Sequence, residues 1–262
     1  MRPALSTLGL PGRPLTEVLR LAAAHHWQGL ELRCAPGEPV HPAMTAEELR
    51  SARREFTAHG ITPLAVASYL GVAAPGDDDR LVSALTDHLR LAAELGARHL
   101  RVFPHGAQSA TDAADRRAVR RLAAAADTAR SLGVRILLET HDSHRSGHDV
   151  ARVLDLVGHP AVGALWDLMH THLAGESPAE SLAALAPHLG YVQVKDIASD
   201  DDLTPIALGA GVLPIAECVQ ALPADCWVSW EYEAPWHPAA APLPGLLGPG
   251  AAYLARLAGQ SV

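Results

Sequence analysis

The sequence lacks several features that mark membrane and secreted proteins. No apolar run reaches the roughly 18 residues that a transmembrane helix needs, so we expect no membrane partner. The first thirty residues hold three prolines and Glu17 but no apolar stretch of about 7–15 residues, so no signal peptide is expected. The three cysteines are widely spaced and form no CxxC pair, which is typical of a protein in a reducing, cytoplasmic environment.

Basic clusters are also missing. Lys and Arg total 21 against 29 Asp and Glu, the formal net charge is −8, and no basic run is longer than a pair of arginines. A nucleic-acid surface needs clustered Lys and Arg, so no nucleic-acid partner is expected. No GxGxxG motif follows the first predicted strand either, which argues against an open, Rossmann-like sheet.

The chain does contain enough apolar material for one large core. It has 262 residues, of which 48% are hydrophobic and 19% charged, so disorder is not expected. Its length is close to that of one (β/α)8 barrel. Helices rich in Ala and Leu can pair between copies of a chain, so a homo-oligomer is one expected form of the protein.

Short apolar runs alternate with amphipathic segments along the whole chain. Alternation of this kind predicts a parallel sheet, and eight β-then-α units at this length predict that the sheet closes. The sequence therefore predicts the α/β class and a single (β/α)8 TIM barrel that spans residues 1–262 as one domain. The predicted strands lie at 4–8, 29–33, 61–68, 99–104, 135–140, 162–167, 191–196 and 227–233.

Four polar residues mark the ends of the last four predicted strands: Glu139, Asp167, Gln193 and Glu231. Because parallel strands end at one face of a barrel, these side chains are expected to meet there. Three carboxylates would repel one another in a low-dielectric site, and a divalent cation removes that conflict. Oxygen ligands suit Mn²⁺, Mg²⁺ or Co²⁺ better than a structural zinc. Taken singly, each carboxylate could instead cap a helix, and Gln193 could satisfy buried backbone.

Three further residues accompany these strand ends. His141 shares the side of Glu139, and either contacts substrate or has a structural role. His170 lies three residues after Asp167, where it contacts substrate or supports a ligand. Lys195 shares the side of Gln193 and either binds a substrate oxygen or pairs with a carboxylate, for which Asp196 is a candidate.

An ordered set of motifs carries a family resemblance. The segments GLELR, RVFP, ILLETHD, ALWDLMHTH, YVQVKD and WEYEAPWHP follow one another along essentially the whole chain. In that order they resemble the xylose isomerase-like TIM-barrel superfamily, and its sugar phosphate isomerase/epimerase branch most closely. The resemblance implies that Glu139, Asp167, Gln193 and Glu231 are metal ligands. Gln193 departs from the family's usual histidine, although some 3-dehydroshikimate dehydratases of the superfamily also have glutamine there.

The resemblance also implies an activity. It is that of a divalent-metal-dependent isomerase or epimerase acting on a sugar or polyol-like hydroxy-carbonyl substrate, by proton transfer through a metal-stabilised enediolate. Mn²⁺ is the expected ion, with Mg²⁺, Co²⁺ or Zn²⁺ as alternatives. Glu139 and Glu231 would exchange protons on opposite faces of the substrate. The expected substrate-binding residues are His170, Lys195, His141, Arg33 and Trp236, with His237 beside them.

Three other functions are weighed against this one. A lyase resembling 3-dehydroshikimate dehydratase would use the same metal site, with Arg33, Arg101 and Lys195 as candidates for a substrate carboxylate. Endonuclease IV needs a trinuclear zinc cluster, and strand ends at Ser68 and Gln193 do not supply its histidines. A metal-free barrel that binds a ligand or a protein is the third alternative, because fold alone does not fix function.

Overall fold

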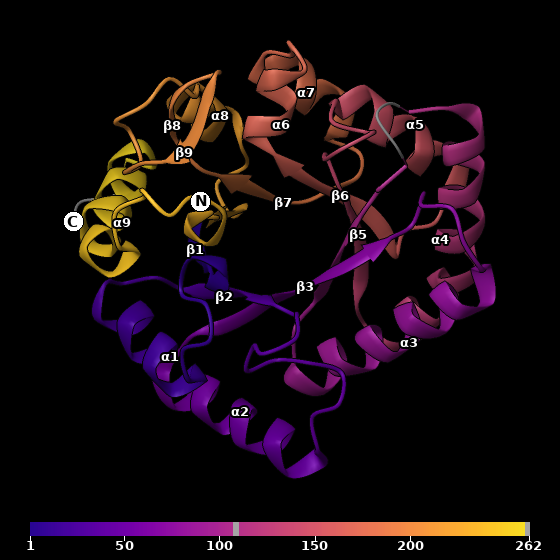
Figure 1. Cartoon of the computed structure of the whole chain (residues 1–262), viewed down its shortest axis with the longest axis horizontal. Helices are drawn as coiled ribbons and strands as arrows, with labels where there is room; N and C mark the ends of the chain where they lie inside the picture. The colour runs from indigo at the N-terminus through magenta and orange to yellow at the C-terminus, as the bar shows by residue number, and fades with distance from the viewer. Residues whose placement is uncertain (107–109, 260–262) are drawn as a thin grey trace.

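The computed structural model describes residues 1–106 and 110–259. Eight parallel strands close into a barrel, in the order β1-β10-β7-β6-β5-β4-β3-β2, and the helices surround it (Figure 1). The predicted (β/α)8 TIM barrel is therefore confirmed. Its strands are β1 (Arg2–Ser6), β2 (Gly29–Arg33), β3 (Thr62–Gly71), β4 (His99–Phe103), β5 (Arg135–Glu139), β6 (Val162–Asp167), β7 (Leu189–Val194) and β10 (Trp227–Trp230).

The helices begin and end at local signals in the sequence. Thr45 opens α2 with a capping box that includes Glu48, and Gly60 ends this helix with a φ of 66°, a conformation that favours glycine. No helix in the described part of the chain is long and apolar enough to cross a membrane. The α-helices are α1 (Leu15–Ala24), α2 (Ala46–His59), α3 (Asp78–Leu95), α4 (Asp112–Leu132), α5 (Gly147–Val157), α6 (Leu168–Leu173), α7 (Pro178–Leu185), α8 (Ile215–Ala221) and α9 (Leu247–Leu257).

The loops contain structure that alternation does not predict. A short hairpin, β8 (Ile197–Ser199) with β9 (Asp202–Pro205), follows β7. The 3₁₀ turns η1 (Thr7–Gly9), η2 (Ala234–Trp236) and η3 (Leu243–Leu246) add to the connections. The last barrel strand ends at Trp230, three residues earlier than predicted. These short elements lack the length over which an apolar period can be recognised.

The core has an outer and an inner part. The outer part fills the space between the barrel and its helices. The inner part is a small apolar cluster inside the barrel, to which Leu137, Leu165 and Tyr191 contribute. Two residues farther along the same strands, the inward positions are Glu139, Asp167 and Gln193, because side chains on a strand alternate with period two. The barrel therefore changes from an apolar floor to a polar layer toward the carboxyl ends of its strands.

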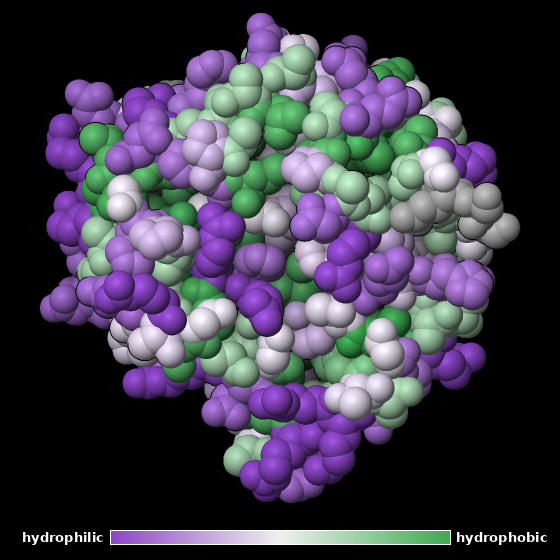
Figure 2. All heavy atoms as spheres, turned by 180° about the vertical axis from the view of Figure 1, so that it is seen from behind, coloured by the Kyte–Doolittle hydropathy of each residue, from purple (hydrophilic) through white to green (hydrophobic). Residues whose placement is uncertain are grey.

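Large apolar side chains are seldom exposed. On the face opposite to that of Figure 1, hydrophilic and hydrophobic residues are intermixed (Figure 2). Single exposed residues of this kind are normal for a folded protein, so they identify no docking surface by themselves. A homo-oligomer therefore stays a prediction. Among the described residues, the exposed large hydrophobic side chains are Tyr69, Leu156, Leu203, Val212 and Trp236.

Close packing around β6 makes a stability prediction. A Cβ at Gly163 would lie 2.5 Å from the carbonyl oxygen of His188 and would also clash with the guanidinium of Arg135. We expect Gly163→Ala to lower the free energy of unfolding by about 1–3 kcal/mol, measured by denaturant titration. Gly245→Ala is the control, since a Cβ there meets no described atom within 4 Å. Equal effects of the two substitutions would contradict the packing argument.

Candidate active site

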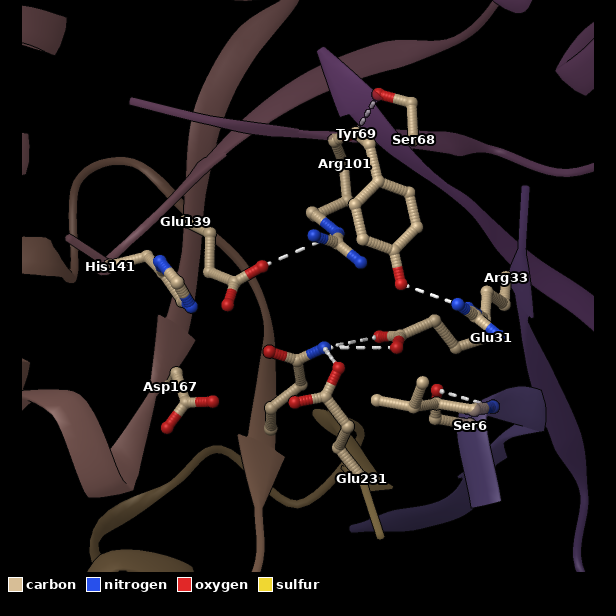
Figure 3. A network of polar contacts seen from close by, with 12 residues as sticks. Ser6, Glu31, Arg33, Ser68, Tyr69, Arg101, Glu139, His141, Asp167 and Glu231 are labelled. Carbon is tan, nitrogen blue, oxygen red and sulfur yellow. Dashed lines mark hydrogen bonds and ion pairs between the residues drawn. The ribbon is translucent and has the colours of Figure 1, made fainter. Parts of the chain in front are cut away.

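The four predicted strand-end residues converge in the polar layer. Asp167 pairs with Gln193 across β6 and β7, and Gln193 pairs with Ser229, two residues before Glu231. Glu139, the last residue of β5, pairs with Leu165 of β6, which precedes Asp167 by two residues. All four side chains are buried. Figure 3 shows Glu139, Asp167 and Glu231 pointing from separate strands toward a common region.

Asp167 has two roles at once. Its Oδ1 accepts hydrogen bonds from the backbone amides of Met169 (2.9 Å) and His170 (3.3 Å), so the residue caps α6. Its Oδ2 lies 2.8 Å from Nζ of Lys195 inside the barrel. Helix capping therefore accounts for one carboxylate oxygen, and the other is directed into the polar layer.

Lys195 links the carboxylates of two strands. Its ammonium lies 2.8 Å from Oδ2 of Asp167 and 2.5 Å from Oε2 of Glu231, and it also contacts Glu233. Burial lowers the pKa of Lys195, but these three carboxylates outweigh burial and raise it well above its ordinary value. Lys195 therefore stays charged and neutralises part of the site.

Asp196 is not the partner of Lys195, and that expectation was wrong. Its Oδ2 accepts hydrogen bonds from the amides of Gly209 (2.8 Å) and Gly211 (3.0 Å), which fixes the loop before α8. The reason is strand geometry, since neighbouring residues point to opposite sides. Because Lys195 faces the barrel interior, Asp196 faces the outside.

The structure adds two residues to the site, Glu31 and Tyr191, that the pattern of strand ends did not include. Glu31 is fully buried, and its carboxylate accepts hydrogen bonds from the Tyr191 hydroxyl (2.6 Å) and from Nε2 of Gln193 (2.9 Å to each oxygen). Burial, and then the charge of Glu231, raise the pKa of Glu31. The sequence does contain a signal for Glu31, because a charged residue inside the apolar strand GLELR, on the same side as Arg33, is unusual unless it is buried with a partner.

Arg101 is the second buried cation. It lies on β4, with Nε 3.3 Å from Oε2 of Glu139 and its guanidinium 3.9 Å from the centre of the Phe103 ring. The side chain is 3% exposed, so it forms part of the polar layer rather than its rim. A guanidinium stacked on an aromatic ring and paired with a carboxylate is held in one orientation. Arg101 therefore positions Glu139.

The two glutamates at the site have different proton affinities. Burial raises the pKa of Glu139 well above its ordinary value. The positive charge of Arg101 lowers this pKa, but the negative charges of Glu231 and Asp167 raise it further. Burial alone would also raise the pKa of Glu231, but Lys195 and Arg101 outweigh it and lower the pKa. Two carboxyl groups with opposite shifts are suited to act as a proton donor and a proton acceptor.

The residues present fit a divalent cation in donor type and in charge. Gln193 Oε1 is buried and accepts no hydrogen bond from the described residues, so an amide oxygen is available as a ligand. Oxygen ligands are the kind that Mn²⁺ and Mg²⁺ prefer. Four buried carboxyl groups face two buried cations, so two negative charges would remain with all four ionised, and a divalent ion would balance them. Without an ion, the raised pKa values of Glu31 and Glu139 favour their protonated forms instead. The carboxylates are Glu31, Glu139, Asp167 and Glu231, and the cations are Arg101 and Lys195.

His141 and His170 lie together beside Glu139. Their ring centres are 4.1 Å apart in an edge-on arrangement, and Phe103 packs 4.5 Å from His141. One ligand atom from each histidine and one carboxylate oxygen of Glu139 lie within 4.8 Å of one another. Burial, followed by the neighbouring charges of His141 and Lys195, lowers the pKa of His170 well below its ordinary value. The structure thus brings both predicted histidines to the site.

Arg33 and Trp236 lie farther out, at the rim. Arg33 donates a hydrogen bond to the Tyr69 hydroxyl (2.8 Å) and pairs with Glu38 (2.6 Å). Its guanidinium lies 5.4 Å from the centre of the Trp236 ring, which is 55% exposed. His237, the neighbour of Trp236, lies 3.4 Å from the Thr204 hydroxyl on β9. These residues can contact a bound molecule from its outer side.

Comparisons with known proteins agree with this architecture. A family model described as xylose isomerase-like TIM barrel matches residues 19–257. No curated protein matches the sequence. Among solved structures, the probable 3-DHS dehydratase AsbF of Bacillus anthracis has 18% identity and a TM-score of 0.81, with 97% of this chain and 98% of that chain covered.

Two further solved structures have the same fold. The IolI protein with a bound zinc atom shares 17% identity at a TM-score of 0.80, with 98% of each chain covered. The D-psicose 3-epimerase of Clostridium cellulolyticum H10, solved with D-tagatose, shares 14% identity at a TM-score of 0.81, also with 98% of each chain covered. At these identities the similarity shows the fold, while activity has to be argued from the site.

Proposed function

The chain belongs to the xylose isomerase-like TIM barrel family, and we propose that it is a divalent-metal-dependent isomerase or epimerase. Its substrate would be a small sugar or polyol-like molecule with a hydroxyl group next to a carbonyl. The reaction would move a proton at the carbon beside that carbonyl. The proposal rests on the arrangement of charged groups in the polar layer, and the family makes this chemistry a reasonable expectation.

The observation that carries the proposal is the pair of buried glutamates, Glu139 and Glu231. They come from strands on different sides of the polar layer, and each is paired with its own cation, Arg101 for Glu139 and Lys195 for Glu231. A substrate between them would have a carboxyl group on each face. One glutamate can remove a proton from one face while the other returns a proton to the opposite face, which inverts the carbon.

A divalent ion would complete this site. Glu139, Asp167, Gln193 and Glu231 are the proposed ligands, with Gln193 contributing Oε1, and Mn²⁺ is the proposed ion. Such an ion would supply positive charge beside the carbonyl oxygen, where negative charge develops as the proton leaves. Lys195 holds Asp167 and Glu231 in position.

The remaining predicted residues would form the walls around this centre. His141 and His170 would form one wall, and Phe103 packs against the ring of His141. Arg33 and Trp236 form the rim and would restrict access of water to the bound substrate. An enclosed site strengthens each electrostatic contact within it.

Exchange with solvent deuterium tests the proposal directly. The protein, supplied with Mn²⁺, is incubated in D₂O with ketoses, with inosose-type cyclitols and with 3-dehydroshikimate, and each product is examined by NMR. We expect a ketose or cyclitol to gain deuterium at the carbon next to its carbonyl and to convert to its isomer. Absence of exchange in every sugar and cyclitol would contradict the assignment.

A lyase is the second candidate, because the site contains two buried cations. Arg101 and Lys195 lie beside the carboxylates, and a substrate carboxylate could compete with these for pairing. The same incubation distinguishes the two functions. Formation of protocatechuate from 3-dehydroshikimate, followed by its absorbance, with no exchange in sugars, would favour the lyase over the epimerase.

A further inference from the structure

Glu31 is a buried carboxylate that faces β7 across the barrel interior. It lies on β2, which β1 and β10 separate from β7 around the barrel. Its Oε2 accepts a hydrogen bond from the Tyr191 hydroxyl at 2.6 Å, and Nε2 of Gln193 lies 2.9 Å from each of its oxygens. Tyr191 and Gln193 are two residues apart on one strand, so both point to the same side of β7. Glu31 therefore binds two consecutive inward side chains of β7, one of which is a proposed metal ligand.

The two ends of the Gln193 amide have opposite hydrogen-bonding character. Its Nε2 only donates and its Oε1 only accepts, while an ionised carboxylate only accepts. Nε2 lies 2.9 Å from both oxygens of Glu31 and 3.2 Å from Oε1 of Glu231, and dashed lines mark these contacts in Figure 3. A reversed amide would place Oε1 against the same carboxylate oxygens, and acceptors that face acceptors repel. The carboxylate of Glu31 therefore selects the orientation in which Nε2 faces β2.

This orientation leaves the amide oxygen of Gln193 without a partner. Oε1 is buried and accepts no hydrogen bond from the described residues. Gln193 pairs in register with Asp167 of β6, so the amide lies beside another proposed ligand. Buried polar atoms normally have a partner, so an oxygen held in this way indicates a position that a bound group occupies.

Glu31 is itself held firmly enough to orient another side chain. Its backbone pairs in register with Ser6 on one side and Ala65 on the other. Tyr191, its second donor, is fully buried in the inner apolar cluster, and the Tyr191 ring lies 5.5 Å from the ring of His99. A supporting residue that is fixed by packing and hydrogen bonds can hold a ligand in one geometry. Both oxygens of Glu31 thus have defined positions opposite Gln193.

We propose that Glu31 is a positioning residue, which directs Oε1 of Gln193 toward the proposed ion and affects that ion through this amide. The inference rests on the proposed ion site and adds to it the residue that makes a glutamine usable as a ligand. An amide held in reverse would present Nε2, a donor that has no lone pair for a cation. Replacing a residue that orients a metal ligand commonly changes metal affinity about 10–100-fold.

A double-mutant cycle of Mn²⁺ affinity tests this role without an activity assay. Chelator-stripped protein is titrated with Mn²⁺ by calorimetry as wild type, Glu31→Gln, Gln193→Met and the double variant. Glu31→Gln keeps the shape of the side chain but offers one donor and one acceptor, so it no longer selects the orientation of Gln193. We expect this substitution to weaken Mn²⁺ binding about 10–100-fold. In the Gln193→Met background no amide remains to be oriented, so the same substitution should change the affinity by less than about twofold.

Two further variants distinguish positioning from loss of charge. Glu31→Asp keeps the charge but withdraws the carboxylate from Nε2 of Gln193 by one methylene group, so it should weaken Mn²⁺ binding as well. Glu38→Gln is the matched control, because Glu38 is also buried but its carboxylate pairs with Arg33 (2.6 Å) and not with β7. The affinity of Glu38→Gln should stay within about twofold of the wild type.

The outcomes separate this inference from the ion site on which it rests. Denaturant unfolding of each stripped variant establishes that folded proteins are compared, and Glu31→Asp supplies the comparison if the double variant does not fold. Wild-type affinity in Glu31→Gln or in Glu31→Asp would overturn the positioning role. Equal weakening by Glu31→Gln in both backgrounds would overturn it too, because the charge would then act through space. In these cases Mn²⁺ binding by the wild type keeps the ion site, whereas a wild type that binds no Mn²⁺ would overturn both.

Discussion

Replacing Glu139 or Glu231 by glutamine is expected to lower turnover of the true substrate about 10³-fold or more. An amide has nearly the shape of a carboxyl group but can neither remove nor return a proton. General acid–base catalysis of this kind contributes about 10²–10⁴-fold, and weaker ion binding adds to the loss. The measurements are kcat for isomer formation and the rate of deuterium exchange, both with Mn²⁺ present. The loss should appear in kcat, since a proton-transfer group acts in the transition state.

Glu233→Gln is the matched control for these two variants. Glu233 contacts the same ammonium of Lys195, but its side chain is 17% exposed and follows Glu231 by two residues. If the ion pairs of Lys195 alone set the activity, Glu233→Gln and Glu231→Gln should behave alike. We expect Glu233→Gln to keep most of the activity. Normal metal content and normal turnover in both Glu139→Gln and Glu231→Gln would show that the site is assigned to the wrong residues.

The barrel and its strand ends could be predicted because they depend on local information. Each apolar run is long enough to read as a strand, and period-two alternation then fixes which side chains face inward. Glu139, Asp167 and Gln193 follow inward apolar residues at that spacing, so their convergence needs only the assumption that the sheet closes. The geometry of their contacts was not predictable from this pattern.

The interior pairing could not be predicted, because it joins residues far apart in the sequence. Gln193 donates to Glu31 across 162 positions of the chain, and Arg101 reaches Glu139 from the preceding strand. Nothing in the sequence near Lys195 shows that its ammonium bridges Asp167 and Glu231. A charged residue inside an apolar strand was the one usable signal, and it indicates burial without identifying the partner.

Arg121→Met is expected to lower the free energy of unfolding by about 3–5 kcal/mol. Arg121 lies on α4 with its side chain 2% exposed. Its guanidinium donates to the carbonyl oxygens of Val72 (2.9 Å), Ala74 (2.6 Å) and Gly76 (2.8 Å). Methionine fills a similar volume but leaves these carbonyls, which lie in the loop between β3 and α3, without their donor. The buried carbonyl of Val72 that loses its partner costs about 1–3 kcal/mol, and the hydrogen bonds lost by the less buried carbonyls of Ala74 and Gly76, at about 1 kcal/mol each, account for the rest of the expected size.

Arg120→Met separates this effect from the loss of a surface ion pair. Arg120 is the adjacent residue and pairs with the same carboxylate, Asp78, but its side chain is 56% exposed. An exposed pair of this kind contributes little to stability, so Arg120→Met should unfold at nearly the wild-type denaturant concentration. Equal destabilisation by both variants would mean that Asp78 pairing, and not support of the loop carbonyls, is what Arg121 contributes. Because that loop follows Tyr69, a partner of Arg33 at the rim, a loosened loop in Arg121→Met should also raise KM while kcat changes less.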